Sequence, residues 1–144
     1  MSGPSPTGQM IHASAVAIDG RGLLILGPSG AGKSGLALQL MALGAMLVAD
    51  DQTLIRRQDD HLWAAAPARL AGKIEARFIG ILAAPHLSCV PLILAVDLGQ
   101  SESQRLPPAR VITFFDLSLP CLHKSDSAHF PAALLHYMKA GRIA

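Results

Sequence analysis

Short apolar runs separated by polar or glycine-containing breaks divide the chain into predicted strands and helices. The N-terminal part is predicted to form a hairpin. Residues 10–18 alternate in the manner of a strand, residues 23–26 are apolar, and the turn signal Asp-Gly-Arg-Gly lies between them. Residues 33–43 contain no β-branched residue and one glycine, which favours a helix. Gly44 is suited to the position that follows a helix end, so this helix is expected to stop there.

The remainder of the chain alternates strand-like and loop-like segments. Residues 53–57 and 61–66 are predicted to form a second hairpin, and a last helix is expected over 130–139, with Pro131 in its first turn. Further strands are expected over 46–49, 92–96 and 111–115, and residues 73–82 have partial strand character. Residues 67–72 are expected to form a loop or a short helical turn, and loops are expected over 83–91 and 100–110. One strand–loop–helix–strand unit combined with hairpins predicts an α/β domain with a mixed sheet.

Composition and charge narrow the class of protein. With 144 residues, the chain is expected to form one domain over residues 10–144, after a small, polar and flexible tail over 1–9. Hydrophobic residues make up 51% and charged residues 15%, which suggests buried interfaces in a homo-oligomer. A net charge of +2 without a basic block argues against nucleic acid or an anionic membrane. The absence of a signal-like or bilayer-spanning run predicts a cytoplasmic protein, in which the two cysteines are expected to be buried free thiols.

The strongest chemical signal follows the second predicted strand. It fits the phosphate-cradling pattern G-x-x-x-x-G-K-[ST] and stands between a strand and a helix, as the pattern requires. The predicted nucleotide-binding residues are Gly27, Pro28, Ser29, Gly30, Ala31, Gly32, Lys33 and Ser34. The glycines let backbone N–H groups approach phosphate oxygens, the lysine brings a positive charge, and the serine offers its hydroxyl to Mg²⁺.

Carboxylates at strand ends are the candidates for the rest of a phosphoryl-transfer site. Asp50 and Asp51 are favoured, because a right-handed crossover after the helix would return their strand beside the P-loop strand. Adjacent side chains on a strand point to opposite faces, so one aspartate is expected to face the phosphates and Mg²⁺ and the other to face away. The pair could instead end a strand and cap a turn. Asp97 ends another apolar strand, where an ordinary strand-to-turn exit is the favoured interpretation.

Glu75 and His12 are open to two interpretations. Glu75 is flanked by Lys73 and Arg77 at strand spacing, so the spacing alone favours a surface ion pair over a metal ligand. His12 lies on a strand expected to neighbour the P-loop strand, within reach of phosphates, although a lone strand histidine is more often structural. The other histidines share no metal-ligand spacing.

Taken together, these segments resemble the catalytic domain of the bacterial HPr kinase/phosphorylase family. His12, the P-loop, residues 47–51 and residues 74–81 occur in the order of that family, and the resemblance extends over about residues 10–125 in a short, single-domain form. It implies a P-loop kinase fold akin to phosphoenolpyruvate carboxykinase. It also implies ATP- and Mg²⁺-dependent phosphorylation of a regulatory serine on HPr or its nitrogen-branch paralogue, and hexameric assembly.

The resemblance also implies roles for individual residues. Asp51 would accept the proton of the serine, and Glu75 would be a metal-linked carboxylate together with Asp50 and Ser34. His12 and Lys33 would act at the phosphates. Arg105 matches a family arginine that assists catalysis.

Two segments depart from the family pattern. Phe78 stands where the family usually has glycine, and residues 121–126 lack the Pro- and Arg-rich loop tied to the phosphorylase reaction. A P-loop kinase or NTPase with another acceptor, and a catalytically silent nucleotide-sensing module, therefore remain as alternative functions.

Overall fold

The computed structural model describes residues 8–144. The tail expected over 1–9 thus lies almost wholly outside the described residues, and Gln9 already belongs to a strand. The strands are β1 (Gln9–Ile11), β2 (Ala13–Ile18), β3 (Arg21–Leu26), β4 (Met46–Ala49), β5 (Thr53–Gln58), β6 (His61–Ala65), β7 (Lys73–Ala76), β8 (Gly80–Ala83), β9 (Cys89–Ser101), β10 (Val111–Phe114) and β11 (Leu117–Lys124). The helices are α1 (Lys33–Ala42), the 3₁₀ turn η1 (Ala68–Leu70) and α2 (Phe130–Ala140).

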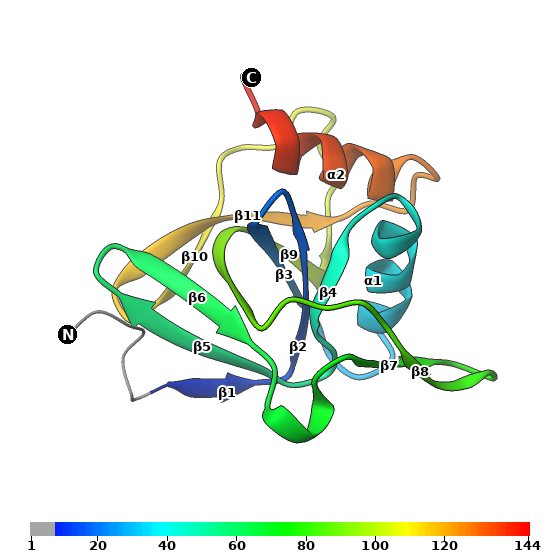
Figure 1. Cartoon of the computed structure of the whole chain (residues 1–144). Helices are drawn as coiled ribbons and strands as arrows, with labels where there is room; N and C mark the ends of the chain where they lie inside the picture. The colour runs from blue at the N-terminus through cyan, green and yellow to red at the C-terminus, as the bar shows by residue number, and fades with distance from the viewer. Residues whose placement is uncertain (1–7) are drawn as a thin grey trace.

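A nine-stranded mixed sheet forms the centre of the molecule (Figure 1). Its order is β1-β5-β6-β9-β3-β2-β4, with β11 also paired to β9 and β10 paired to β11. Strands β3, β9 and β11 run parallel to one another, whereas β2 is antiparallel to both β3 and β4. Strands β7 and β8 form a separate hairpin. The mixed α/β architecture with a P-loop helix and a C-terminal helix is thus confirmed.

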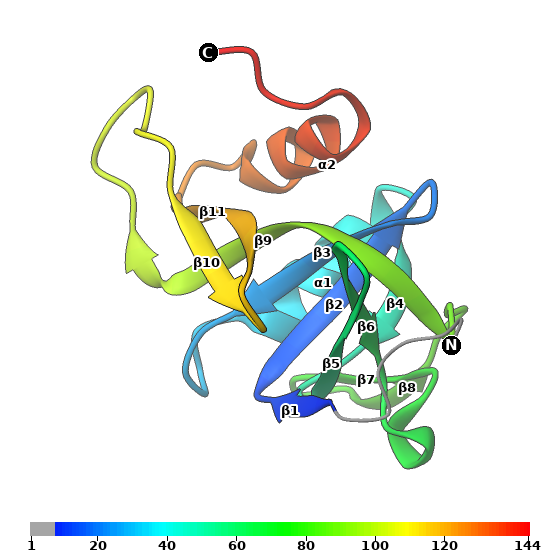
Figure 2. The ribbon, with the colours of Figure 1, turned by 90° about the vertical axis from the view of Figure 1, so that its left-hand side faces the viewer.

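The central hairpin β2–β3 is covered on both faces. Leu23 and Ile25 of β3 belong to the hydrophobic cluster that includes α1 and α2, and Leu24 belongs to the cluster on the other face, with Ile55 of β5 and Leu62 of β6. Figures 1 and 2 show the two helices on one side of this hairpin and the β5–β6 hairpin on the other. Because successive strand residues point to opposite faces, burial on both sides requires the uninterrupted apolar run of β3.

Two predicted strand placements are wrong. The strand expected over residues 10–18 is interrupted at His12, with β1 paired to β5 and β2 paired to β3 and β4. The strand that follows α1 does not lie beside the P-loop strand, because β2 and β9 occupy the two edges of β3. Strand β4 therefore takes the free edge of β2, one position farther from the P-loop.

The C-terminal half contains more strand than the pattern predicts. Strand β9 continues to Ser101, residues 73–82 form the two strands of the β7–β8 hairpin, and β11 was not predicted at all. Pro120 lies within β11 and weakens its strand signal. By contrast, the local predictions are confirmed for both helices, the β5–β6 hairpin and the turn at 68–70. Gly44 follows α1 at φ 111°, as expected for the position after a helix end.

The cysteine prediction is only half correct. Both Cys89 and Cys121 are free, but Cys89 is exposed at the start of β9 and only Cys121 is buried. Within residues 8–144, neither α1 nor α2 has the length and apolar character that crossing a bilayer requires.

Candidate active site

The P-loop forms a cradle at the start of α1. Gly32 is the N-cap at φ 101°, a left-handed conformation that a side chain would strain, and Ala31 N–H donates to Pro28 O (3.0 Å), which closes the turn before it. The N–H groups in the first turn of a helix have no partner within the helix and carry its positive dipole end. The loop therefore offers an anion-binding surface.

Lys33 lies folded against this loop. Its Nζ donates to Gly27 O (2.8 Å) and Pro28 O (3.1 Å), and the residue is only 6% exposed. The ammonium thus lies against the loop, with its hydrogen bonds made to two backbone carbonyls. A phosphate oxygen entering the cradle can replace one of these neutral carbonyls, and its negative charge is then compensated by the ammonium.

Asp50 joins three separate segments of the chain. Its Oδ1 accepts hydrogen bonds from Ser34 Oγ (2.6 Å) and Ser14 Oγ (2.9 Å), and its Oδ2 accepts one from Glu75 N–H (3.0 Å). The residue is 7% exposed. The carboxylate is therefore held rigidly against the P-loop serine, although Asp50 and Ser34 are 16 positions apart.

Asp51 turns toward a different part of the site. Its Oδ1 lies 3.2 Å from His12 Nε2, and its N–H donates to Ser14 Oγ (3.1 Å). Asp51 has a left-handed φ of 68°, which aspartate tolerates better than most residues. The expectation that one aspartate faces away from the site is wrong, because the strand ends at Ala49 and the turn brings both carboxylates to the site.

The cavity in front of the P-loop has a volume of about 370 Å³ and is lined by residues of both charges. Five P-loop residues line it, together with Asp51 and residues from β1–β2, α1 and β7. Its lining is His12, Ser29, Gly30, Gly32, Lys33, Ser34, Gly35, Leu38, Asp51, Glu75 and Arg77. Gly27, Pro28 and Ala31 of the P-loop lie outside this lining.

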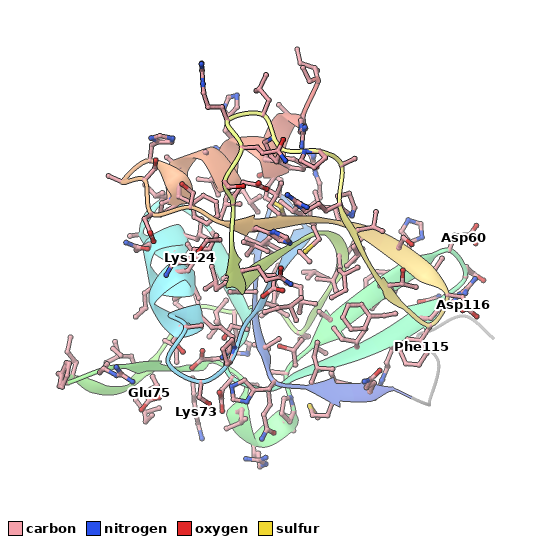
Figure 3. The ribbon with its side chains drawn as sticks, turned by 180° about the vertical axis from the view of Figure 1, so that it is seen from behind. Asp60, Lys73, Glu75, Phe115, Asp116 and Lys124 are labelled. Carbon is pink, nitrogen blue, oxygen red and sulfur yellow. The ribbon has the colours of Figure 1, made fainter. Side chains whose placement is uncertain are left out.

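Glu75 faces the cavity from the β7–β8 hairpin (Figure 3). Among the described residues it makes no ion pair, and Lys73 Nζ instead donates to Arg69 O (3.1 Å). The prediction of a surface ion pair between Glu75 and Lys73 or Arg77 is therefore wrong. The backbone N–H of Glu75 holds Asp50, which couples the hairpin to the P-loop side of the site.

The donor set of the cavity fits a hard divalent cation bound together with phosphate. Ser34 and Glu75 line the cavity, and Asp50, which is not in its lining, accepts a hydrogen bond from Ser34 Oγ. All three side chains offer oxygen atoms, the ligands that Mg²⁺ prefers. Within the described part of the chain, no group of three or more His, Cys, Asp or Glu side chains could hold a metal alone. Mg²⁺ is usually held by one or two carboxylates and by the oxygens of a substrate phosphate, and Asp50 and Glu75 would supply such carboxylates.

Two residues singled out in the sequence lie outside the cavity. Arg105 is exposed in the loop between β9 and β10 and is not among the lining residues. Phe78, at φ 70°, is fully exposed in the turn of the β7–β8 hairpin and does not narrow the cavity.

Sequence reasoning missed Ser14 and Arg77 as members of the site. Ser14 is completely buried, donates to Asp50 and accepts from Asp51. The signal for it was available, since it is the single polar residue of an otherwise apolar strand. From the sequence, Arg77 is only a neighbour of Glu75, yet in the structure it adds a second permanent cation to the cavity beside Lys33.

Comparison with known proteins gives a family for this arrangement. The family model described as HPr Serine kinase C-terminal domain matches residues 6–91. The HPr kinase/phosphorylase of Levilactobacillus brevis is 36% identical over 125 residues, which cover 78% of this chain and 40% of the relative. That of Bacillus licheniformis is 45% identical over 104 residues, or 65% of this chain and 34% of the relative. The chain thus spans less than half the length of these curated relatives.

One solved structure is similar in fold over most of its own chain and most of this one. The HPr(Ser) kinase/phosphatase from Coxiella burnetii superposes with a TM-score of 0.76 at 25% identity, covering 91% of this chain and 88% of that one. The family model includes the P-loop, both aspartates and Glu75, over more than half of the sequence. The chain therefore belongs to the HPr serine kinase C-terminal domain family.

Proposed function

We propose that the chain is an ATP- and Mg²⁺-dependent kinase that phosphorylates a serine of an HPr-like phosphocarrier protein. One observation carries the proposal. A continuous set of hydrogen bonds runs from Ser34 of the P-loop through Asp50 and Ser14 to Asp51. It couples a phosphate cradle to an accessible carboxylate, which are the two halves that phosphoryl transfer needs.

The donor nucleotide binds with its phosphates at the first turn of α1. Backbone N–H groups from Gly30 to Ser34 and the ammonium of Lys33 compensate the phosphate charge. Ser34, Asp50 and Glu75 would hold Mg²⁺, which neutralises charge on the phosphate oxygens when it is bound. Three hydrogen bonds already orient Asp50, and one of them comes from Ser34, so its carboxylate lies beside the hydroxyl that would share the metal.

Asp51 receives the proton of the acceptor. Its side chain is 61% exposed and faces the cavity, so a serine hydroxyl of a second protein can reach it. As the bond between the serine oxygen and the γ-phosphorus forms, the bond to the bridging oxygen of ADP breaks and the hydroxyl proton passes to Asp51. His12 keeps the carboxylate oriented through its contact at 3.2 Å. In the reverse direction, Asp51 returns the proton when phosphate or water attacks the phosphoserine.

The acceptor and the assembly are inferred from the relatives and from the surface. The relatives bear the name HPr kinase/phosphorylase, which supports HPr or its paralogue as the acceptor. Exposed apolar side chains of the β7–β8 hairpin, Phe78, Ile79 and Ile81, suit contact with another protein and support a homo-oligomer. The proposed partner HPr places the protein in the cytoplasm. Sedimentation of the purified protein tests the assembly, and a monomer at micromolar concentration would contradict it.

Transfer of labelled γ-phosphate to HPr from the same organism tests the function. Wild-type protein with Mg²⁺ should label HPr on serine, and Asp51→Asn should lower the rate at least 100-fold while ATP still binds, because the amide cannot accept the proton. Asp60→Asn in the exposed β5–β6 turn is the matched control and should leave the rate unchanged (Figure 3). Equal rates in wild type and Asp51→Asn would refute the mechanism. ATP turnover that does not depend on HPr would indicate another acceptor.

A further inference from the structure

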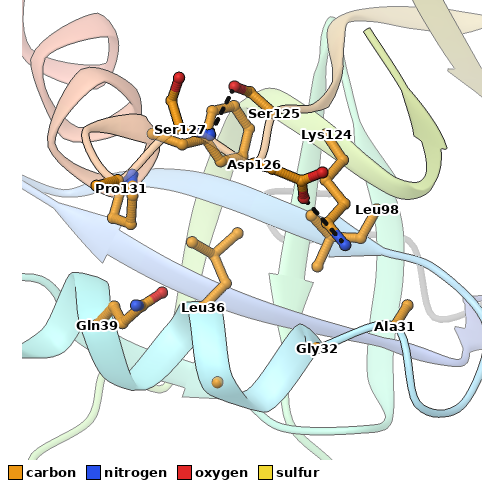
Figure 4. A pocket seen from close by; sticks show the side chains of 13 residues that line it. Ala31, Gly32, Leu36, Gln39, Leu98, Lys124, Ser125, Asp126, Ser127 and Pro131 are labelled. Carbon is orange, nitrogen blue, oxygen red and sulfur yellow. Dashed lines mark hydrogen bonds and ion pairs between the residues drawn. The ribbon is translucent and has the colours of Figure 1, made fainter.

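A second cavity lies on the other side of the P-loop helix from the active-site cavity. We call it the linker cavity, because residues 124–128, which link β11 to α2, form one of its walls. Its volume is about 480 Å³, within the range of roughly 300–1,000 Å³ that is usual for small-molecule sites. Figure 4 shows the linker on one side of the cavity and α1 on the other.

The linker cavity adjoins the phosphate cradle directly. Gly32 and Gly35 line both cavities, and Ala31 of the P-loop lines only the linker cavity. A molecule held at the first turn of α1 can therefore extend into either cavity. The two cavities differ in what else they contain, because the active-site cavity holds the acceptor carboxylate Asp51 and the linker cavity does not.

The sheet topology makes the linker cavity a natural extension of the P-loop site. Strands β3, β9 and β11 are parallel, so their carboxyl ends lie at the same edge of the sheet. The P-loop follows β3, Leu98 lies near the end of β9, and Lys124 ends β11. Ligands of α/β proteins bind outside the carboxyl ends of parallel strands, and the linker cavity stands at this edge. Asp50 follows β4, on the opposite side of β3.

The chemistry of its walls suits a flat heterocycle joined to a sugar. Leu36 and Leu98 are buried and, with Phe130, give the cavity an apolar interior. Gln39 on α1 carries both a donor and an acceptor, which is the combination needed to recognise the edge of a base. At the rim, Lys124 Nζ lies 3.6 Å from Asp126 Oδ1 (Figure 4), and this carboxylate is 89% exposed. It is thus free to accept hydrogen bonds from sugar hydroxyls.

We propose that the linker cavity binds the nucleoside part of the donor nucleotide. The inference rests on the proposed kinase function and specifies how that site recognises its donor. The phosphates lie at Gly32 to Gly35, the γ-phosphate faces Asp51, and the base and ribose lie between α1 and the linker. This arrangement leaves the active-site cavity open to the acceptor serine, which has to approach the γ-phosphate from the side of Asp51.

Filling the linker cavity with a large side chain tests the proposal. Ala128 lines the cavity and is exposed, so Ala128→Trp is expected to fold. Ala133 lies nearby in α2, is also exposed and does not line the cavity, so Ala133→Trp is the matched control. Binding of ATP and of inorganic tripolyphosphate is measured with Mg²⁺ for wild type and both variants. Ala128→Trp should weaken ATP binding at least tenfold and leave tripolyphosphate binding unchanged, because tripolyphosphate has no nucleoside.

Measuring both ATP and tripolyphosphate distinguishes an error in this inference from an error in the proposed function. Equal binding of ATP by Ala128→Trp and wild type, or equal weakening of ATP and tripolyphosphate, would overturn the nucleoside site but leave the phosphate site intact. A wild-type protein that binds neither compound would overturn the proposed function and this inference together.

Two further measurements do not depend on a bulky substitution. Gln39→Ala removes an exposed amide and should change the ratio of ATP to GTP affinity at least threefold while tripolyphosphate affinity stays constant. In wild-type protein, photolysis of bound 8-azido-ATP should label a peptide that contains residues 124–131. Labelling confined to the β7–β8 hairpin would place the base in the other cavity and refute the proposal.

Discussion

The buried hydroxyl of Ser14 offers the sharpest test of how the site is held together. Ser14→Ala removes the donor to Asp50 Oδ1 and the acceptor of the Asp51 N–H, at a position with no exposed surface. A hydrogen bond to a charged group contributes about 1.5–3 kcal/mol, and a backbone N–H left unpaired costs about 1–3 kcal/mol. Some of the second cost is recovered because Asp51 is exposed to water. We expect a loss of about 2–3 kcal/mol in the free energy of unfolding.

This loss corresponds to a large change in thermal stability. For a chain of this size, 1 kcal/mol shifts Tm by roughly 3 °C, so Ser14→Ala should lower Tm by about 6–9 °C. The rate of phosphate transfer, measured at 20 °C where both proteins are folded, should fall about 10- to 100-fold. The reason is that Asp51 loses the contact that orients its turn, and small displacements of a catalytic group are costly.

A second serine provides the control. Ser118 Oγ lies 3.0 Å from Thr113 Oγ1 in an exposed pair on the β10–β11 hairpin. Ser118→Ala should change stability by less than about 0.5 kcal/mol and leave the rate unchanged. If Ser14→Ala lowers Tm by less than 2 °C, or changes the rate by less than twofold, Ser14 does not connect the two aspartates as we infer.

Three further predictions concern other parts of the molecule. Phe78→Gly should raise Tm by about 1–3 °C in thermal unfolding, because Phe78 is fully exposed in a left-handed conformation that glycine adopts without strain; a lower Tm would contradict this. In native protein at pH 8, one thiol should react rapidly with a disulfide reagent, since Cys89 is exposed while burial raises the pKa of Cys121; Cys89→Ser should abolish this fast phase. The hydrogen bond from Arg110 lowers the pKa of Glu102, so the stability that the pair adds is present above pH 4.5 and is lost as the pH falls through the lowered pKa. The difference in Tm between wild type and Arg110→Gln should accordingly shrink between pH 6 and pH 3, and a constant difference would argue against the pair.

Local features of this chain could be predicted from the sequence, because they depend on residues that are close together along the chain. The P-loop pattern, the start of α1 at Lys33 and its end before Gly44 depend on residues only a few positions apart. The β2–β3 and β5–β6 hairpins follow from apolar runs joined by short polar turns. Asp50 and Asp51 are candidates because they follow an apolar strand. Asp97 meets the same criterion, although a strand-to-turn exit is the favoured interpretation there.

The resemblance added residues that local patterns could not assign. Spacing alone favoured a surface ion pair for Glu75, whereas the structure turns it toward the cavity and uses its N–H to hold Asp50. Arg105 shows the opposite case, since it matches a family position but lies on an exposed loop away from the cavity. A side chain's role in a site depends on where its element packs, which spacing along the chain does not determine.

The sequence by itself determined a phosphate cradle, the helix behind it, two hairpins and the pair of acidic residues after β4. Only the tertiary structure decided that β2 separates β4 from the P-loop strand, and that β9 and β11 run parallel to β3. The same long-range pairing buried Ser14 between the two aspartates and formed the linker cavity beside α1. The physical reason is that the pairing of a strand depends on which other strands, far away in the sequence, can hydrogen-bond to its edges. It also depends on how well both faces of the sheet are buried, and the residues of one strand determine neither.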